Sequence, residues 1–414
     1  MSRWPAARGV RCSSIDVFRV GFLAFAMRAA LVCSPSAAVL LASSAFGLLA
    51  AAPLLVIIRL VRLGAAVVPR PPVVIGYESA LEFWRKTWLA GNGDAGDLLG
   101  DPFPDDLLLA GAESPELLAG YPKLQPAANR AAGARRVSGL VGLSEPVGLI
   151  VESAACRNET EKFRSCVWSP SVWQGLTAQV EDNIYVCAPE LAFLQMAGRL
   201  GFAALLDLAF ELCGDYVLLD SKLHVGRHRE DMRRLATPER LQAVCALHKR
   251  VPGIVRARIA SKYVLPNSWS PMESRMVALL ALPRSQGGFG CGNPVLNKRI
   301  YLSEDLSVMA GRKYVVPDAL YEDAGIAFEY QGSLHDGTGN RRRDDSKSNA
   351  LLLMGIETIR VWDEQLCSPN DLGEIAAYVR KRRGIRLKTE NAKMATRQAA
   401  LMADFKALTK RVGK

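Results

Sequence analysis

The sequence predicts a mixed α/β protein, in which an α+β middle region precedes a second mixed sheet flanked by helices. Three observations predict this class. Short β-branched runs alternate with longer segments whose apolar residues recur at helical spacing. Pro189 followed by Glu190 is a typical helix start. Toward the C-terminus the expected order is helix, three strands, helix, strand and helix, which is typical of a sheet covered on both faces.

Composition divides the chain into four expected parts. They are a basic and apolar N-terminal segment at 1–70, an α+β middle domain at 71–265, a C-terminal α/β domain at 268–383 and a basic helical tail at 384–414. A chain of 414 residues can build two or three domains with their own cores. Because 50% of the residues are hydrophobic, the composition excludes a disordered protein.

The charge is concentrated at the C-terminal end. The net charge is +11, and residues 380–414 carry twelve Lys or Arg against two acidic residues. This balance indicates a polyanionic partner, for which DNA is the natural candidate. Two interpretations of the tail are open: a helix that follows a phosphate backbone, or a solvated terminal helix.

The first 70 residues differ in composition from the rest. Residues 29–58 contain no charged side chain, and this length is sufficient for a helix to span a bilayer. Arginines flank both ends, so the charge rule for orientation gives little guidance. Three interpretations are open: attachment to the cytoplasmic membrane through 29–58, a wrongly assigned start codon, or a buried helical hairpin. A possible N-terminal transmembrane helix therefore joins the expected fold class.

The cysteines indicate a reducing compartment. There are nine, an odd number, and none forms a CxxC pair. Several lie in apolar runs, where a free thiol acts as a small hydrophobic side chain. The pattern implies neither a zinc site nor a disulfide framework, and we expect a cytoplasmic protein.

The expected elements of the middle region follow from their periodicity. A strand leads into a helix over 73–90, and a Gly-, Asp- and Pro-rich loop covers 91–135. Further strands are expected at 147–152, 165–168 and 183–187, helices at 189–201 and 203–213, and one or two amphipathic helices within 237–258.

The C-terminal part is the most informative. Its expected elements are a helix at 269–282, the start of a sheet at 295–301, strands at 314–317, 326–330 and 358–362, and helices at 344–354 and 371–383. One strand is followed by Asp318 and the next carries Glu329, so neighbouring strands bring two carboxylates to one edge of a sheet. Acids at strand ends are often no more than solvated edge residues.

The chemistry that these acids suggest is metal-assisted cleavage of a phosphodiester. Two close carboxylates repel each other, so one of them stays partly protonated unless a cation is bound. Mg²⁺ typically takes one or two carboxylates, several waters and a phosphate oxygen, and it can generate a nucleophilic hydroxide. Arginines near the acids suit bidentate contacts to phosphate. We therefore expect Mg²⁺ or Mn²⁺ as cofactor.

These residues resemble a known signature. Val316, Pro317 and Asp318, then Glu329 and Gln331, then His335 resemble the pattern of the PD-(D/E)XK nuclease superfamily. The subgroup most similar comprises restriction-like domains of unknown function related to very-short-patch repair endonucleases. The middle region, around 185–216, resembles the one that precedes such domains in actinobacterial proteins of this type. More faintly, it is similar to abortive-infection antitoxin proteins.

The resemblance covers 268–383 and implies a restriction-endonuclease-like core with endodeoxyribonuclease activity of the restriction, repair or defence kind. It assigns roles to individual residues. The metal ligands would be Asp318, Glu329 and Glu273. Gln331 would position water, and His335 would act as base. The phosphate would be held by four arginines: Arg341, Arg342, Arg343 and Arg360. A lone histidine is more often structural than catalytic, and the assignment of His335 competes with that interpretation.

The chain departs from the signature at Gln331, where the family has Lys or, in this subgroup, Asp. An amide can orient a water but supplies neither a full charge nor a general base. This departure keeps an alternative function open: a non-catalytic DNA-binding regulator, antitoxin-like, built on a decayed nuclease core.

Overall fold

The structure is a computed structural model that describes residues 72–90, 123–124, 142–181, 183–219, 228–230, 232, 234–332, 338–386 and 392–410. The chain divides into two compact units, 1–70 and 71–414. The first unit, with the predicted membrane-spanning stretch at 29–58, lies outside the described residues. Within the described ranges, no helix is long and apolar enough to cross a membrane.

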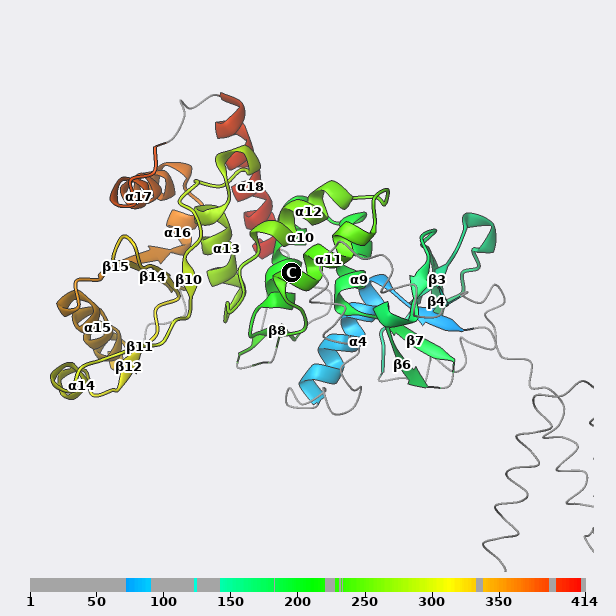
Figure 1. Cartoon of the computed structure of the whole chain (residues 1–414), viewed down its shortest axis with the longest axis horizontal. Helices are drawn as coiled ribbons and strands as arrows, with labels where there is room; N and C mark the ends of the chain where they lie inside the picture. Colours follow the sequence, from blue (N-terminus) through cyan, green and yellow to red (C-terminus); the bar gives the residue numbers. More distant parts are fainter. Residues whose placement is uncertain are drawn as a thin grey trace, which may run out of the picture. The chain divides into compact units, whose positions relative to one another are not determined.

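The second unit is mixed α/β, with mixed sheets flanked by helices. Its larger sheet has the order β4-β3-β1-β7-β6 (Figure 1). The strands are β1 Val73–Ile75, β3 Val147–Val151, β4 Phe163–Val167, β6 Thr177–Glu181 and β7 Ile184–Cys187. Parallel pairing joins β1 to β7 and β3 to β4, whereas β1 and β3, and β6 and β7, are antiparallel. The strands β1, β3 and β7 are buried along their whole length, which explains their continuous apolar sequences.

Five helices accompany this sheet. They are α4 Tyr77–Ala90, α9 Pro189–Ala197, α10 Phe202–Cys213, α11 Pro238–Leu247 and α12 Ile254–Tyr263. All nine residues of α9 are buried, and α9 contacts the other four helices. A helix that is buried on every side, its polar residues Glu190 and Gln195 included, is surrounded by protein, so α9 is the centre of the helical layer.

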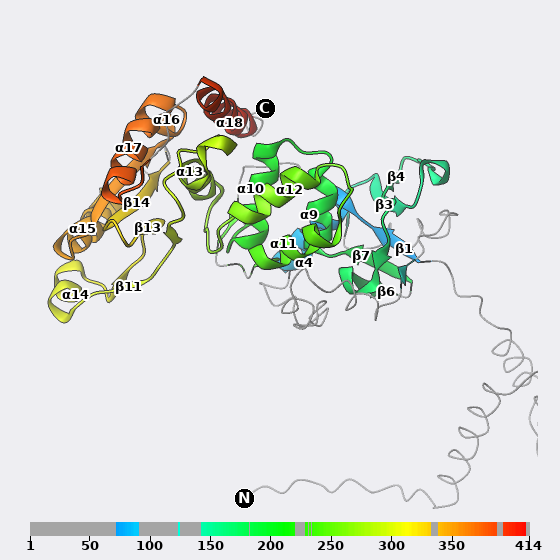
Figure 2. The ribbon, with the colours of Figure 1, turned by 45° about the horizontal axis from the view of Figure 1, so that its top comes forward.

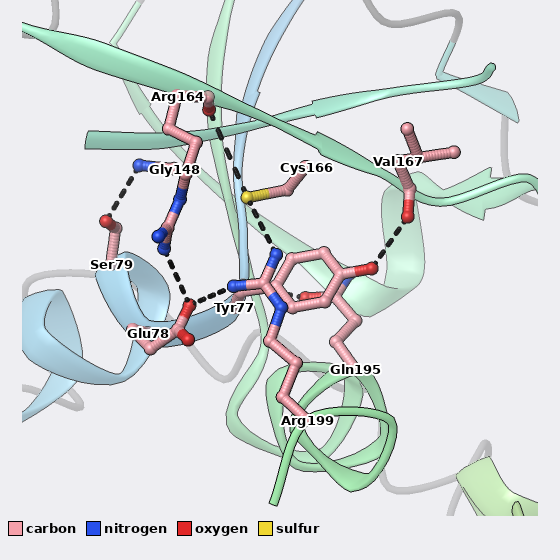
Figure 3. A network of polar contacts seen from close by, with 9 residues as sticks. All are labelled: Tyr77, Glu78, Ser79, Gly148, Arg164, Cys166, Val167, Gln195 and Arg199. Atoms are coloured by element: carbon pink, nitrogen blue, oxygen red, sulfur yellow. Dashed lines mark hydrogen bonds and ion pairs between the residues drawn. The ribbon is translucent and has the colours of Figure 1, made fainter. Parts of the chain in front are cut away.

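A polar network fixes the start of α4 against the sheet (Figure 3). The backbone N–H of Tyr77 donates to Oε1 of Gln195 at 2.8 Å, and the Tyr77 hydroxyl donates to the Val167 carbonyl at 2.7 Å. Ser79 Oγ accepts from the Gly148 N–H at 2.8 Å. The guanidinium of Arg199 lies 3.9 Å from the centre of the Tyr77 ring. The two Tyr77 donors and the Gly148 N–H therefore each have an acceptor on another element, as buried polar groups require.

The C-terminal part contains a four-stranded sheet with the order β10-β13-β14-β15. The strands are β10 Val295–Leu296, β13 Ala319–Tyr321, β14 Ile326–Gln331 and β15 Glu357–Trp362. The first three are antiparallel to their neighbours, and β15 is parallel to β14. The helix α15, Thr338–Leu353, makes the crossover that a parallel pair needs. The helices α13 Pro271–Ala281 and α17 Pro369–Arg382 complete this region, which Figure 2 shows.

Two details differ from the expected strands. The run at 314–317 contributes only β12, Tyr314–Val315, which pairs with β11, Ile300–Tyr301, in a separate two-stranded sheet. Pro317 explains this break, because proline lacks the N–H that a strand ladder needs. Asp318 therefore precedes the strand β13 instead of ending the one before. The expected single strand at 295–301 is likewise interrupted at Asn297, whose φ is +45°.

The basic tail forms α18, Ala392–Lys410, which packs against α10 and against the short 3-10 helix Arg284–Gln286. Helical spacing predicts an apolar face of Ala395, Ala399, Met402, Phe405 and Leu408 in this tail. Of these, Met402, Phe405 and Leu408 are buried, together with Leu401. Ala395 and Ala399 of that face are exposed. The docked side of α18 therefore differs from the predicted one in its first half, where Gln398 Nε2 donates to the Gly288 carbonyl at 2.8 Å.

The cysteines of the described part are free thiols, seven in number, and five of them are buried. This agrees with their expected packing role.

Candidate carboxylate site

Asp318, the residue before β13, lies close to Glu329 of the neighbouring strand β14. The antiparallel register pairs Ala319 with Phe328, so one step further along the ladder places Asp318 opposite Glu329. Opposite residues of an antiparallel pair have their Cβ atoms about 5 Å apart and on the same face. The Tyr330 N–H donates to Asp318 Oδ2 at 2.7 Å, so the aspartate side chain caps the end of the ladder.

The crossover helix adds a residue that the sequence patterns missed. Lys347 Nζ of α15 lies 2.5 Å from Glu329 Oε1, and both side chains are mostly buried, with 15% and 13% of their surface exposed. Lys347 also lowers the pKa of Asp318. A sequence signal for it existed: Ala350 and Leu351, three and four residues later, are the buried residues of this helix. A lysine at that spacing shares their face and points toward the sheet.

Glu273 joins the two strand acids from the first turn of α13. Ser270 caps this helix, because its Oγ accepts from the Glu273 N–H at 3.2 Å. The Glu273 carboxylate accepts in turn from the Trp269 N–H and from Asn297 Nδ2, both at 3.0 Å. Burial and, next, the charge of Asp318 raise the pKa of Glu273 to about 7, although these hydrogen bonds lower it in part.

The pKa of Asp318 is also raised to about 7. Burial is the largest cause and the charge of Glu329 the second, whereas Lys347 and the Tyr330 N–H act in the opposite direction. Asp318 and Glu273 nevertheless keep part of their surface open to solvent. The site therefore holds two largely buried carboxyl groups whose pKa values are raised to about 7, and such raised values cluster at functional sites.

Two asparagines with left-handed backbone hold Glu273 in place. Asn267 and Asn297 have φ values of +74° and +45°, a region that asparagine tolerates better than most residues. Asn297 Nδ2 donates to the Asn267 carbonyl at 2.8 Å as well as to Glu273. The Asn297 N–H donates to the Asp318 carbonyl at 3.1 Å. One asparagine thus connects the Glu273 carboxylate with the backbone of Asp318.

The remaining predicted residues divide into two groups. Arg360 lies opposite Glu329 in the parallel pair and donates to Ser348 Oγ of α15 at 3.0 Å, and Gln331 is the half-buried last residue of β14. His335 lies outside the described residues, as do the side chains of three arginines in the first turns of α15: Arg341, Arg342 and Arg343. Their proposed roles stay predictions.

The metal expected at this site is Mg²⁺ or Mn²⁺, and the ligands that the site offers are carboxylate oxygens. Within the described ranges, no three His, Cys, Asp or Glu side chains are grouped as a metal cage. Mg²⁺ does not require one, since it uses one or two carboxylates and completes its shell with water. The opposed Asp318 and Glu329 fit that requirement, and a cation would relieve the repulsion that raises the pKa of Asp318.

In comparisons with known proteins, no family model, curated protein or solved structure matches this chain. Its function is therefore inferred from the side chains themselves. Three carboxyl groups, one lysine and a nearby arginine can bind a divalent cation, accept a proton near neutral pH and neutralise an anionic substrate.

Proposed function

We propose that this protein is a metal-dependent endodeoxyribonuclease of the restriction, repair or defence type, with a PD-(D/E)XK restriction-endonuclease-like core. The observation that carries the proposal is the nearness of Asp318, the residue before β13, to Glu329 of the neighbouring strand β14, with Lys347 at 2.5 Å from Glu329. Lys347 supplies, from the following helix, the positive charge that Gln331 does not supply from the strand. The departure at Gln331 is thereby compensated.

The side chains have distinct tasks in this proposal. Asp318 and Glu329 would hold Mg²⁺ or Mn²⁺, which would supply positive charge beside the phosphate and lower the pKa of the attacking water. Lys347 donates to a phosphate oxygen or to the attacking water. Glu273, whose pKa is raised to about 7, accepts a proton at physiological pH. Gln331 orients water from the end of its strand, and Arg360 contributes positive charge on the same face.

The second candidate is a non-catalytic DNA-binding regulator. It is favoured by the ion pair that already neutralises Glu329, since a carboxylate engaged by Lys347 has less capacity for a metal. A regulator would bind DNA with the salt dependence of phosphate contacts and without regard to Mg²⁺.

Cleavage of linear, nicked and mismatched DNA by the full chain, with Mg²⁺ and with Mn²⁺, separates the two. We expect Asp318→Asn to reduce metal-dependent cutting by at least ~100-fold, as for the loss of a catalytic acid or base. Asp323→Asn is the matched control, because Asp323 lies in the turn of the same hairpin, is exposed and pairs with Arg383. No cutting by the wild type, together with salt-sensitive binding that ignores Mg²⁺, would establish the regulator instead.

A further inference from the structure

A cleft of about 790 Å³ lies next to the carboxylate site. One wall comes from the segment that leads into α11, including Arg234 and Thr237, and the other from the loops that carry Trp269, Asn297 and Arg299. Volumes of this size are typical of small-molecule sites and accommodate a single nucleotide, but not a duplex.

The cleft and the carboxylate site share a wall. Trp269 and Asn297 line the cleft, and both donate hydrogen bonds to Glu273. Asn297 also donates to the Asp318 carbonyl. Glu230, two residues before the lining residue Met232, raises the pKa of Asp318 and therefore lies within electrostatic range of it. A molecule in the cleft is thus adjacent to the carboxyl groups that we propose to be reactive.

The lining is positively charged. Arg234 Nε lies 2.7 Å from Asp215 and its Nη2 donates to Asn267 Oδ1 at 3.0 Å, so its guanidinium plane is fixed. Arg240 lies 2.7 Å from the fully buried Glu190. Arg299 is exposed, with its guanidinium 5.2 Å from the centre of the Tyr314 ring. The residues that line the cleft thus include three arginines and a single acid, Asp215, so the positive excess belongs to the lining, and the acids Glu273 and Asp318 lie next to it.

Two further features point to a phosphate-bearing ligand with a flat ring. Thr237 caps α11, so the cleft lies at the N-terminal end of that helix, where the partial charge is positive. Trp269 is half-buried, and an aromatic side chain in a basic groove is the usual partner of an unpaired base. A base inside a duplex is covered by its neighbours and cannot reach such a wall.

We propose that this cleft binds one unpaired nucleotide of the DNA strand that is cut, with its phosphate on Arg299 and Arg234 and its base against Trp269. The inference rests on the proposed nuclease function and adds the substrate class: DNA with a single-stranded or extruded nucleotide beside the scissile bond. It also gives the middle region a direct part in substrate binding.

The test is a binding experiment on the full chain carrying Asp318→Asn, so that no probe is cut. The probes are a labelled single strand, a duplex with one unpaired nucleotide and the same duplex fully paired, measured by fluorescence anisotropy. We expect the first two to bind at least ~10-fold more tightly than the third, since stacking of one base on an aromatic side chain has that value. Equal affinity for all three probes would overturn the inference.

Substitutions locate the binding site. In the chain that carries Asp318→Asn, the additional substitution Arg299→Ala should weaken binding of the unpaired probes about 10-fold. It should also reduce the slope of log affinity against log salt concentration by about one. Lys298→Ala is the matched control, because Lys298 is the neighbouring exposed cation but pairs with Glu322 outside the cleft. Trp269→Ala should lose the preference for unpaired probes and Trp269→Phe should keep it. Equal effects of Arg299→Ala and Lys298→Ala would overturn the inference.

The two proposals fail differently. If the wild type cuts DNA but its inactive form shows no preference for an unpaired nucleotide, the nuclease stands and the cleft assignment is overturned. If the inactive form prefers unpaired probes through Arg299 and the wild type never cuts, the cleft assignment stands and the catalytic proposal is overturned.

Discussion

The acidic side chains of the helical layer and those of the C-terminal sheet differ in their partners. In the helical layer two buried acids each have a guanidinium of their own: Glu211 is bound by two nitrogens of Arg85 at 2.7 and 2.5 Å, and Asp207 by two nitrogens of Arg275 at 3.1 and 2.6 Å. At the C-terminal sheet, Asp318 and Glu329 share Lys347, and Glu273 accepts from the neutral donors Trp269 N–H and Asn297 Nδ2.

This difference distinguishes structural charges from functional ones. A bidentate pair gives each ion a partner of opposite charge, although burial still raises the pKa of Asp207 to about 6. Closely spaced carboxylates repel one another until a cation or a proton binds. Their repulsion lowers the stability of the folded state, and contacts elsewhere in the fold offset that loss. The contrast identifies the carboxylate site more sharply than the spacing of its residues does.

The largest effect is expected where a structural pair is broken. Arg275→Met leaves Asp207 buried without its guanidinium and also removes the bond from Arg275 Nη1 to the Phe405 carbonyl. We expect the free energy of unfolding, from denaturant titration, to fall by about 3–5 kcal/mol. Adding Asp207→Leu should recover most of the loss, since the uncompensated charge is then absent. A loss below about 1 kcal/mol in the single variant would show that this pair is not structural.

The next effect is a pH dependence with the opposite sign to that of a salt-bridged acid. The folded-state pKa values of Asp318 and Glu273 are raised to about 7, above the unfolded values near 4. The folded state therefore binds more protons between about pH 4 and pH 7, and stability should fall as pH rises through that window, by up to ~1.4 kcal/mol per pH unit for each group. Above about pH 7 the loss is complete.

Thermal unfolding across pH 4 to 8 measures this window. The double variant Asp318→Asn with Glu273→Gln should reduce the slope of the curve and be more stable than the wild type at pH 8, with the remaining slope contributed by the buried Asp207, whose pKa is raised to about 6. Mg²⁺ should raise the unfolding temperature of the wild type more at pH 8 than at pH 5, because it binds the ionised carboxylates. A wild-type curve that rises from pH 4 to 7 with the same slope in both proteins would contradict the raised pKa values.

A smaller effect is expected at Lys347. Because Lys347 lowers the pKa of Asp318, Lys347→Met should shift the acidic limb of the pH–rate profile for DNA cutting to higher pH by about one unit, and should reduce the maximal rate. Lys347→Arg should leave the limb near its wild-type position. A merely structural lysine would change the rate without moving the limb.

The smallest effect is expected at an exposed pair. Lys298 and Glu322 form an ion pair with 45% and 50% of their side-chain surfaces exposed. We expect Lys298→Ala to change the free energy of unfolding by less than about 0.5 kcal/mol, in the same denaturant titration. A larger loss of unfolding free energy would show that an exposed pair stabilises the fold as a buried pair does.

The sequence could predict the helices and strands that depend on residues close together in the chain. The strand that carries Glu329 follows from its short apolar run. The nearness of Asp318 to it was expected from the wrong strand, because the run at 314–317 pairs with β11, and Asp318 precedes β13, which contains no β-branched residue. The split of 295–301 at Asn297 was not predictable, because asparagine only permits a left-handed backbone and long-range bonds to Asn267 and Glu273 select it.

The side chains of the site show the same limit. Glu273 was placed correctly on its helix, but its nearness to Asp318 depends on how α13 meets the sheet. Lys347 was overlooked because its importance comes from a contact across 18 residues with Glu329. Similarly, the docked side of α18 is chosen by α10, which the tail sequence alone does not specify.

The helix α13 has a consequence for how this protein can be divided. It presents Glu273 to the carboxylate site, and two residues later Arg275 holds Asp207 of α10 and the Phe405 carbonyl of α18. A fragment limited to 268–383 would leave Arg275 without either partner, at the helix that positions an acid of the site. The region that resembles a nuclease therefore cannot be transferred to another protein by itself. A fusion or truncation that preserves the site must include the helical layer and the tail.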